Sequence, residues 1–168
     1  MVTQRTFGTL PSGEEVQIYH LENKSGAFAE VLQFGAILVK LCVPDRDGRL
    51  TDVVLGYDDL AGYEVNGCFF GATIGRSGNR IAQSRFTLDG KEIVLTPNEG
   101  ANNLHSGPDG YSSRKWSSEI VEDERGLAVR FSLISPDGDQ GMPGELHISA
   151  MYVLTEDDSV ILEYEGVA

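Results

Sequence analysis

Residues 85–95 read Arg-Phe-Thr-Leu-Asp-Gly-Lys-Glu-Ile-Val-Leu, and this stretch indicates a β-hairpin. Apolar side chains recur at every second position on either side of the Asp89-Gly90 pair, as they do in strands that bury one face. An Asp-Gly pair favours a two-residue type I′ turn, because both positions of that turn need positive φ angles. We therefore predict antiparallel strands over residues 85–88 and 92–95.

Short alternating runs of this kind extend along the rest of the chain. Twenty glycines separate them, and no window holds a helical period, so helix is expected only as a turn near residues 58–63. Gly35 is expected at a bend between two strands. Further strands are predicted at residues 3–9, 15–22, 28–34, 36–44, 52–55, 116–121, 127–134, 145–154 and 160–164. The pattern predicts an all-β chain that forms an antiparallel β-sandwich as a single domain over residues 1–168.

The charge balance narrows the class of partner. The chain has 13 Lys and Arg against 26 Asp and Glu, a formal net charge of −13. Phosphate backbones and anionic lipids are repelled by such a surface, so neither nucleic acid nor a membrane is expected as a partner. The first residues lack the basic start and apolar run of a signal peptide, and the apolar stretches are only as long as strands, which predicts a cytoplasmic protein.

The two cysteines, Cys42 and Cys68, both lie among apolar neighbours and lack a metal-ligand spacing. We expect them to be buried free thiols. The pairs Asp45-x-Asp47 and Asp137-x-Asp139 are similar to the start of a calcium loop, but later oxygen ligands are missing, so plain turns are expected. No metal site is predicted.

Two stretches interrupt the strand pattern and are candidate sites. One ends in Gly75-Arg76-Ser77-Gly78-Asn79-Arg80, and the other is a long polar loop over residues 96–111; such loops on a rigid β scaffold often carry function. Arginine offers a planar fork of donors and asparagine both donates and accepts, so Asn79 and Arg80 suit the vicinal hydroxyls of a sugar. The alternative is a capping asparagine beside an arginine that pairs with a surface acid. No Lys-Ser or Lys-Thr follows, so the glycines do not form a phosphate loop.

The three histidines divide by position. His20 and His147 lie in predicted strands and are interpreted as structural. His105 lies in the non-periodic loop, between two asparagines and a glycine. From the residues alone, His105 is either a functional group or an ordinary loop histidine.

Five segments, taken together and in order, carry a resemblance to a known family. They are residues 52–57 (Asp-Val-Val-Leu-Gly-Tyr), 70–82 (which include Gly-Arg-Ser-Gly-Asn-Arg), 86–91 (Phe-Thr-Leu-Asp-Gly-Lys), 103–107 (Asn-Leu-His-Ser-Gly) and 135–144 (Ser-Pro-Asp-Gly-Asp-Gln-Gly-Met-Pro-Gly). In order and spacing the chain resembles the aldose 1-epimerases, or galactose mutarotases. The resemblance implies a β-sandwich of the galactose mutarotase-like (supersandwich) type, incomplete here, and an isomerase that interconverts the α and β anomers of free hexoses such as galactose or glucose. It implies no cofactor.

The resemblance also implies roles for particular residues. Asn79, Arg80 and His105 would bind the sugar, with His105 also acting catalytically near the ring oxygen. Ser106 stands where the family often has glycine, and Met142 where an aromatic residue is common. The family's proton-donor histidine, a sugar-binding aspartate and a glutamate base lie beyond the position that matches Ala168. We therefore expect the isolated chain to be deficient in mutarotation, and to self-associate or be completed by a carboxy-terminal half.

Three other functions remain open at this point. A related hexose-6-phosphate 1-epimerase would need a basic phosphate pocket, and no extra Arg/Lys cluster surrounds Asn79 or His105. A non-catalytic carbohydrate-binding or structural β-sandwich would keep the same three residues without turnover. An interaction subunit, completed by a second chain, would be active only on mixing.

Overall fold

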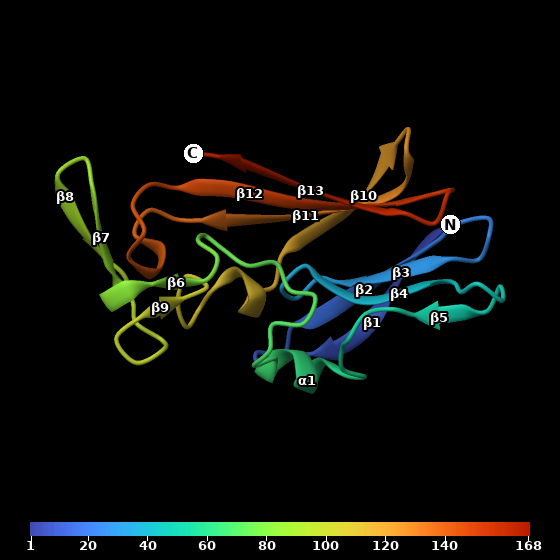
Figure 1. The fold of residues 1–168 in the computed structure, drawn as a ribbon, viewed down its shortest axis with the longest axis horizontal. Helices are drawn as coiled ribbons and strands as arrows, with labels where there is room; N and C mark the ends of the chain where they lie inside the picture. Colours follow the sequence, from blue (N-terminus) through green and yellow to red (C-terminus); the bar gives the residue numbers. More distant parts are fainter.

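Two antiparallel β-sheets, packed face to face, make up most of the molecule in the computed structural model, which describes residues 1–168 (Figure 1). The first sheet has the strand order β1-β2-β3-β4-β5 and the second β10-β11-β12-β13. The first sheet consists of β1 (Val2–Thr9), β2 (Glu15–Glu22), β3 (Phe28–Leu32), β4 (Ile37–Pro44) and β5 (Leu50–Asp52). The second consists of β10 (Ser117–Asp123), β11 (Gly126–Ser135), β12 (Leu146–Thr155) and β13 (Val160–Val167). The predicted all-β sandwich is confirmed.

Two small ladders lie beyond one end of the sandwich, on the left of Figure 1. One pairs β6 (Arg80–Ile81) with β9 (Asn103–Leu104), and the other is the hairpin of β7 (Arg85–Leu88) and β8 (Lys91–Val94). Asp89 and Gly90 have φ angles of 50° and 76°, the positive values that a type I′ turn needs. The predicted hairpin is confirmed, with its second strand beginning one residue earlier. Single turns of 3₁₀ helix cover residues 82–84, 111–113 and 139–141.

The main core lies between the two sheets. Tyr19 and Val31 of the first sheet meet Phe131 and Tyr152 of the second, and Trp116 is 1% exposed among them. The Tyr152 hydroxyl donates a hydrogen bond to the Ala36 carbonyl at 2.8 Å, and burial raises the pKa of Tyr152. This hydrogen bond joins β12 of the second sheet to the turn between β3 and β4 of the first.

A second core covers the other face of the first sheet. The helix α1 (Leu60–Val65) packs Leu60 and Tyr63 against Ile18 and Ile37. Its N-terminus is capped by Asp59, whose carboxylate accepts from the Gly62 backbone N–H at 2.9 Å, as N-cap residues do. The turn predicted near residues 58–63 is therefore a short amphipathic helix that closes the outer layer.

The prediction of a strand at residues 52–55 was wrong. β5 ends at Asp52, and Val53 and Leu55 are 58% and 72% exposed. The Asp52 carboxylate accepts from the backbone N–H groups of Leu41 and Val54, each at 3.2 Å. Because a side chain takes the place of a backbone acceptor there, the ladder stops.

The cysteine prediction was right for one residue and wrong for the other. Both thiols are free, but only Cys42, in β4, is buried. Cys68 is exposed because it lies in the turns that follow α1 rather than in a strand. Apolar neighbours in sequence therefore did not imply burial at Cys68.

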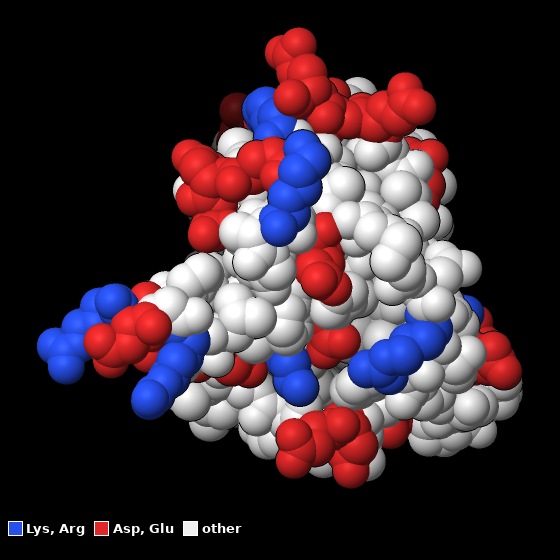
Figure 2. Space-filling model, turned by 90° about the vertical axis from the view of Figure 1, so that its right-hand side faces the viewer, with Lys and Arg blue, Asp and Glu red and all other residues white.

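Acidic side chains dominate the end of the sandwich opposite the small ladders. Figure 2 shows this end: acidic groups gather at the top and bottom of the view, the tip that projects to the left carries basic as well as acidic groups, and the basic groups form no single patch. None of the helices in this structure has the length and apolar character needed to cross a membrane.

Candidate functional site

The β6–β9 ladder brings together the three site residues predicted from the sequence. In this ladder Arg80 pairs with Leu104, so Asn79 precedes one strand and His105 follows the other. The His105 backbone N–H donates to the Asn79 carbonyl at 3.0 Å and extends the pairing by one step. Asn79, Arg80 and His105 therefore form one cluster at the end of the molecule that carries the small ladders.

The His105 ring is fixed by a backbone donor. The backbone N–H of Asn79 donates to His105 Nδ1 at 3.0 Å, so the neutral ring carries its hydrogen on Nε2. Burial, and after it the charge of Arg80, lowers the pKa of His105, while Glu99 acts in the opposite direction. Phe69 packs edge-on against the ring, with centroids 4.7 Å apart. His105 is therefore a neutral Nε2–H donor at neutral pH.

Arg80 pairs with the surface acid Glu99, as the alternative interpretation of the sequence allowed, although the sequence did not indicate which acid. Its Nε and Nη2 bind the two carboxylate oxygens of Glu99 at 2.6 and 2.5 Å, and Nη1 donates to Asn79 Oδ1 at 3.2 Å. The hydrogen bond from Arg80 lowers the pKa of Glu99. The only signal for Glu99 was its place in the polar loop over residues 96–111.

Two side chains hold that loop in shape. Asn98 closes a turn by donating from Nδ2 to the Leu104 carbonyl at 2.9 Å and accepting from the Leu104 N–H at 2.7 Å. Ser106 links the two candidate loops, because its hydroxyl accepts from the Ser77 N–H at 2.6 Å and donates to the Ser77 carbonyl at 3.2 Å. The serine that replaces a common glycine thus adds a cross-link beside His105.

With these contacts described, comparison with known proteins gives the family. A sequence model of the family described as aldose 1-epimerase matches residues 17–168. The chain belongs to the aldose 1-epimerase family. It is 41% identical to bovine galactose mutarotase over 161 residues, which are 95% of this chain and 46% of that protein. It is 37% identical to the Escherichia coli aldose 1-epimerase over 156 residues, 93% of this chain and 44% of that enzyme.

Two solved structures of similar proteins share the fold. A galactose 1-epimerase from Lactobacillus acidophilus superposes with a TM-score of 0.87 at 25% identity, over 100% of this chain and 48% of that one. An aldose epimerase homologue from C. elegans superposes with a TM-score of 0.81 at 36% identity, over 90% of this chain and 46% of that one. The chain thus spans about half the length of the relatives it matches. The predicted mutarotase-like fold is confirmed.

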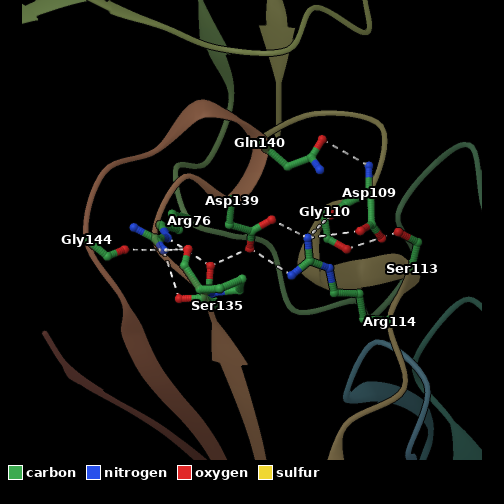
Figure 3. A network of polar contacts seen from close by, with 10 residues as sticks. Arg76, Asp109, Gly110, Ser113, Arg114, Ser135, Asp139, Gln140 and Gly144 are labelled. Atoms are coloured by element: carbon green, nitrogen blue, oxygen red, sulfur yellow. Dashed lines mark hydrogen bonds and ion pairs between the residues drawn. The ribbon is translucent and has the colours of Figure 1, made fainter.

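The loop that carries Asn79 and Arg80 rests on a polar network (Figure 3). Arg76 donates from Nε to the Ser135 hydroxyl at 2.9 Å, and from Nη2 to the carbonyls of Ser135 and Gly144 at 3.0 and 2.7 Å. Its Nη1 donates to the Pro143 carbonyl at 3.0 Å. Because every guanidinium nitrogen thus has a protein acceptor, Arg76 supports the loop rather than a ligand.

A buried ion pair continues the network. Arg114 binds both oxygens of Asp139, at 2.7 and 2.6 Å, and these side chains are only 15% and 8% exposed. Burial pushes the pKa of Asp139 upward, but the hydrogen bonds from Arg114 and Ser135 outweigh it, so the pKa is lowered. Asp137 accepts from the Gly144 N–H. The Asp137-x-Asp139 pair is therefore a turn held by protein partners, as predicted.

The other two histidines lie on the sheets. His20 in β2 lies 3.2 Å from Glu22 and 3.5 Å from Glu30, and His147 in β12 lies 3.0 Å from Glu145. Neither joins the cluster around His105, so the structure separates them from the candidate site.

A small cleft opens beside the cluster. It has a volume of about 200 Å³ and is lined partly by Phe69, Asn98 and Gly107. Phe69 lines this cleft and also packs against the His105 ring. A ligand held by His105 would lie next to this cleft.

Proposed function

We propose that the whole protein is an aldose 1-epimerase that acts on a free hexose such as galactose or glucose, and that this chain supplies part of its sugar site. Asn79 and Arg80 would hold sugar hydroxyls, and His105 would bind near the ring oxygen. The observation that carries the proposal is the Asn79–His105 hydrogen bond, which leaves a neutral ring with its Nε2–H free, beside the donors of Arg80.

The reaction assigns a use to that donor. A base takes the proton of the C1 hydroxyl, the C1–O1 bond becomes a carbonyl, the bond between C1 and the ring oxygen breaks, and an acid protonates the ring oxygen. Negative charge builds on the ring oxygen before the proton arrives. A fixed Nε2–H of His105 pointing at that oxygen stabilises the charge. Rotation about C1–C2 and the reverse steps give the other anomer.

This chain's residues would bind and polarise the sugar rather than move its protons. The resemblance assigns the proton donor and the base to the part of the family pattern beyond the match to Ala168. Hydrogen bonds within the protein fix the side chains of Asn79 and Arg80. These side chains would in turn hold the sugar hydroxyls in place and so fix the geometry of the reacting atoms. We also propose a cytoplasmic location, since the free thiols Cys42 and Cys68 suit a reducing compartment.

Calorimetric titration with galactose tests the binding role. We expect the wild-type chain to bind, and Arg80→Gln and His105→Asn to weaken binding about tenfold or more, because each removes a directed or charged hydrogen bond. Asn is chosen because it tolerates the φ of 53° at position 105. Arg85→Gln is the matched control, since Arg85 is another arginine paired with a glutamate, Glu92. Equal affinity in all four proteins would contradict the proposal.

Polarimetry on freshly dissolved α-galactose tests the catalytic part. We expect the isolated chain to match the buffer rate. A rate well above buffer that is lost in His105→Asn would show that the chain also supplies an acid and a base, and would overturn the division of roles proposed above.

A further inference from the structure

We propose that Glu99 is a specificity and positioning residue: it occupies the edge of Arg80 that would otherwise grip an anion, and so restricts the site to uncharged sugars. The inference rests on the proposed sugar-binding function of Arg80. It goes beyond that function because it names the residue that separates free hexoses from sugar phosphates and sugar acids.

The first argument is the geometry of the guanidinium. Phosphate and carboxylate groups bind arginine best through two parallel N–H groups on one edge. In Arg80 the Nε/Nη2 edge is already taken by both oxygens of Glu99, at 2.6 and 2.5 Å. The third nitrogen, Nη1, donates one hydrogen to Asn79 Oδ1 at 3.2 Å. One N–H on Nη1 and one on Nη2 remain for sugar hydroxyls, while the Nε/Nη2 edge is closed to an anion.

The second argument is charge. Arg80 and Glu99 together carry no net charge, and His105 beside them is held neutral by its hydrogen bond from Asn79 and by the lowered pKa described above. The chain as a whole has a net charge of −13. The Glu99 carboxylate would repel an anionic ligand, with no free cation to balance that repulsion. A neutral sugar would not be repelled.

The third argument is that hydrogen bonds to the backbone hold the turn that carries Glu99, whatever the charge of the Glu99 side chain. The Glu99 N–H donates to the Asn102 carbonyl at 3.1 Å, and the Asn102 N–H donates back to the Glu99 carbonyl at 2.9 Å. The Asn98 side chain closes the same turn on both backbone groups of Leu104. Because these contacts do not involve the Glu99 side chain, the turn should survive its substitution.

The test compares Glu99→Gln and Glu99→Ala with the wild type, in the full chain. Glutamine keeps the size of the Glu99 side chain but removes its charge, and alanine leaves the Nε/Nη2 edge of Arg80 open. Glu92→Gln is the matched control, since it breaks the surface pair with Arg85 instead. The ligand is inorganic phosphate, followed by calorimetry and by the NMR shift of the Arg80 Nε–H. Galactose is titrated in parallel.

We expect phosphate affinity to rise in the order wild type, Glu99→Gln, Glu99→Ala, with about a fivefold gain for the glutamine, the effect of removing one unit charge at contact distance in water. We also expect the pKa of His105, followed by NMR, to fall in Glu99→Gln, because Glu99 acts to raise it. That fall would show that the Glu99 charge acts inside the site. The Glu92→Gln control should move neither quantity.

Two failures can be told apart. Unchanged phosphate affinity and an unchanged His105 pKa in Glu99→Gln would overturn the role of Glu99, whatever happens with galactose. Absence of galactose binding by the wild type, together with the expected phosphate and pKa changes, would overturn the proposed function but not the role of Glu99 in excluding anions.

Discussion

The Asn79 backbone N–H donates to Nδ1 of the His105 imidazole at 3.0 Å, and this hydrogen bond is one of several that join the two loops of the candidate site. Both residues have positive φ angles, 61° and 53°. Only a few L-residues take this conformation readily, asparagine among them. This backbone conformation directs the Asn79 N–H at Nδ1 of His105, so the neutral ring carries its own hydrogen on Nε2.

The first prediction follows from that bond. Protonation of His105 puts a hydrogen on Nδ1, which then faces the Asn79 N–H and breaks the contact. An unfolded histidine takes up a proton near pH ~6.5, whereas burial and Arg80 lower the pKa of folded His105. Below pH ~6.5 the unfolded state thus binds more protons than the folded state. The free energy of unfolding therefore falls as the pH drops from ~6.5 toward the lower pKa of folded His105, and this group causes no loss of stability above pH ~6.5.

Thermal unfolding at about pH 7.5 and about pH 5.5, on either side of the histidine range, measures this effect. The wild type should lose more stability on acidification than His105→Asn, which has no group to titrate at this position. Equal losses in the two proteins would mean that the Asn79 contact does not hold the neutral ring.

The sequence predicted the sandwich well because its signals were local. Alternation in β2 places Tyr19 toward one core and Ile18 toward the other, and the Asp89-Gly90 pair determines its own turn. Asn79, Arg80 and His105 were found through the loops they occupy and through the family resemblance. These are features that neighbouring residues carry by themselves.

What the sequence could not predict depends on partners far along the chain. Glu99 reaches Arg80 across 19 positions, and a charged residue in a polar loop has no periodicity to mark it. Cys68 was expected to be buried from its apolar neighbours, but burial of a turn depends on what packs over it. The early end of β5 at Asp52 reflects a side-chain hydrogen bond, which strand patterns do not include.

The second prediction concerns Ser106, which is 3% exposed with φ of 68°. Ser106→Ala removes both hydrogen bonds to Ser77 and keeps the unfavourable φ, so it should cost about 1–3 kcal/mol. Ser106→Gly loses the same bonds but relieves the backbone, which offsets about 1 kcal/mol of that loss. Urea unfolding of both variants checks the order. Alanine that is no worse than glycine would show that the hydroxyl, not the backbone, sets the whole cost.

The third prediction concerns the buried Arg114–Asp139 pair. Asp139→Asn leaves the Arg114 charge in place without its partner, and breaking a buried pair in this way costs about 3–5 kcal/mol. Asp109, whose side chain is 63% exposed, also lies 3.1 Å from Arg114. Asp109→Asn should therefore cost less than about 1 kcal/mol, as an exposed partner does. Similar unfolding midpoints for the two variants in urea would mean that solvent reaches the pair.

The fourth prediction tests whether close packing under the loop positions Asn79 and Arg80. A Cβ at Gly75 would lie 2.1 Å from the ring of Tyr111, which is 3% exposed and packs edge-on against Trp116. The ring has no room to retreat, so in Gly75→Ala the loop must move. We expect a loss of about 1–3 kcal/mol in the free energy of unfolding, as for an overpacked core, together with weaker galactose binding. Gly78→Ala in the same loop is the control, because its Cβ meets nothing within 4 Å. If urea unfolding and calorimetry give the same values for both variants, the contact with Tyr111 does not hold the loop in place.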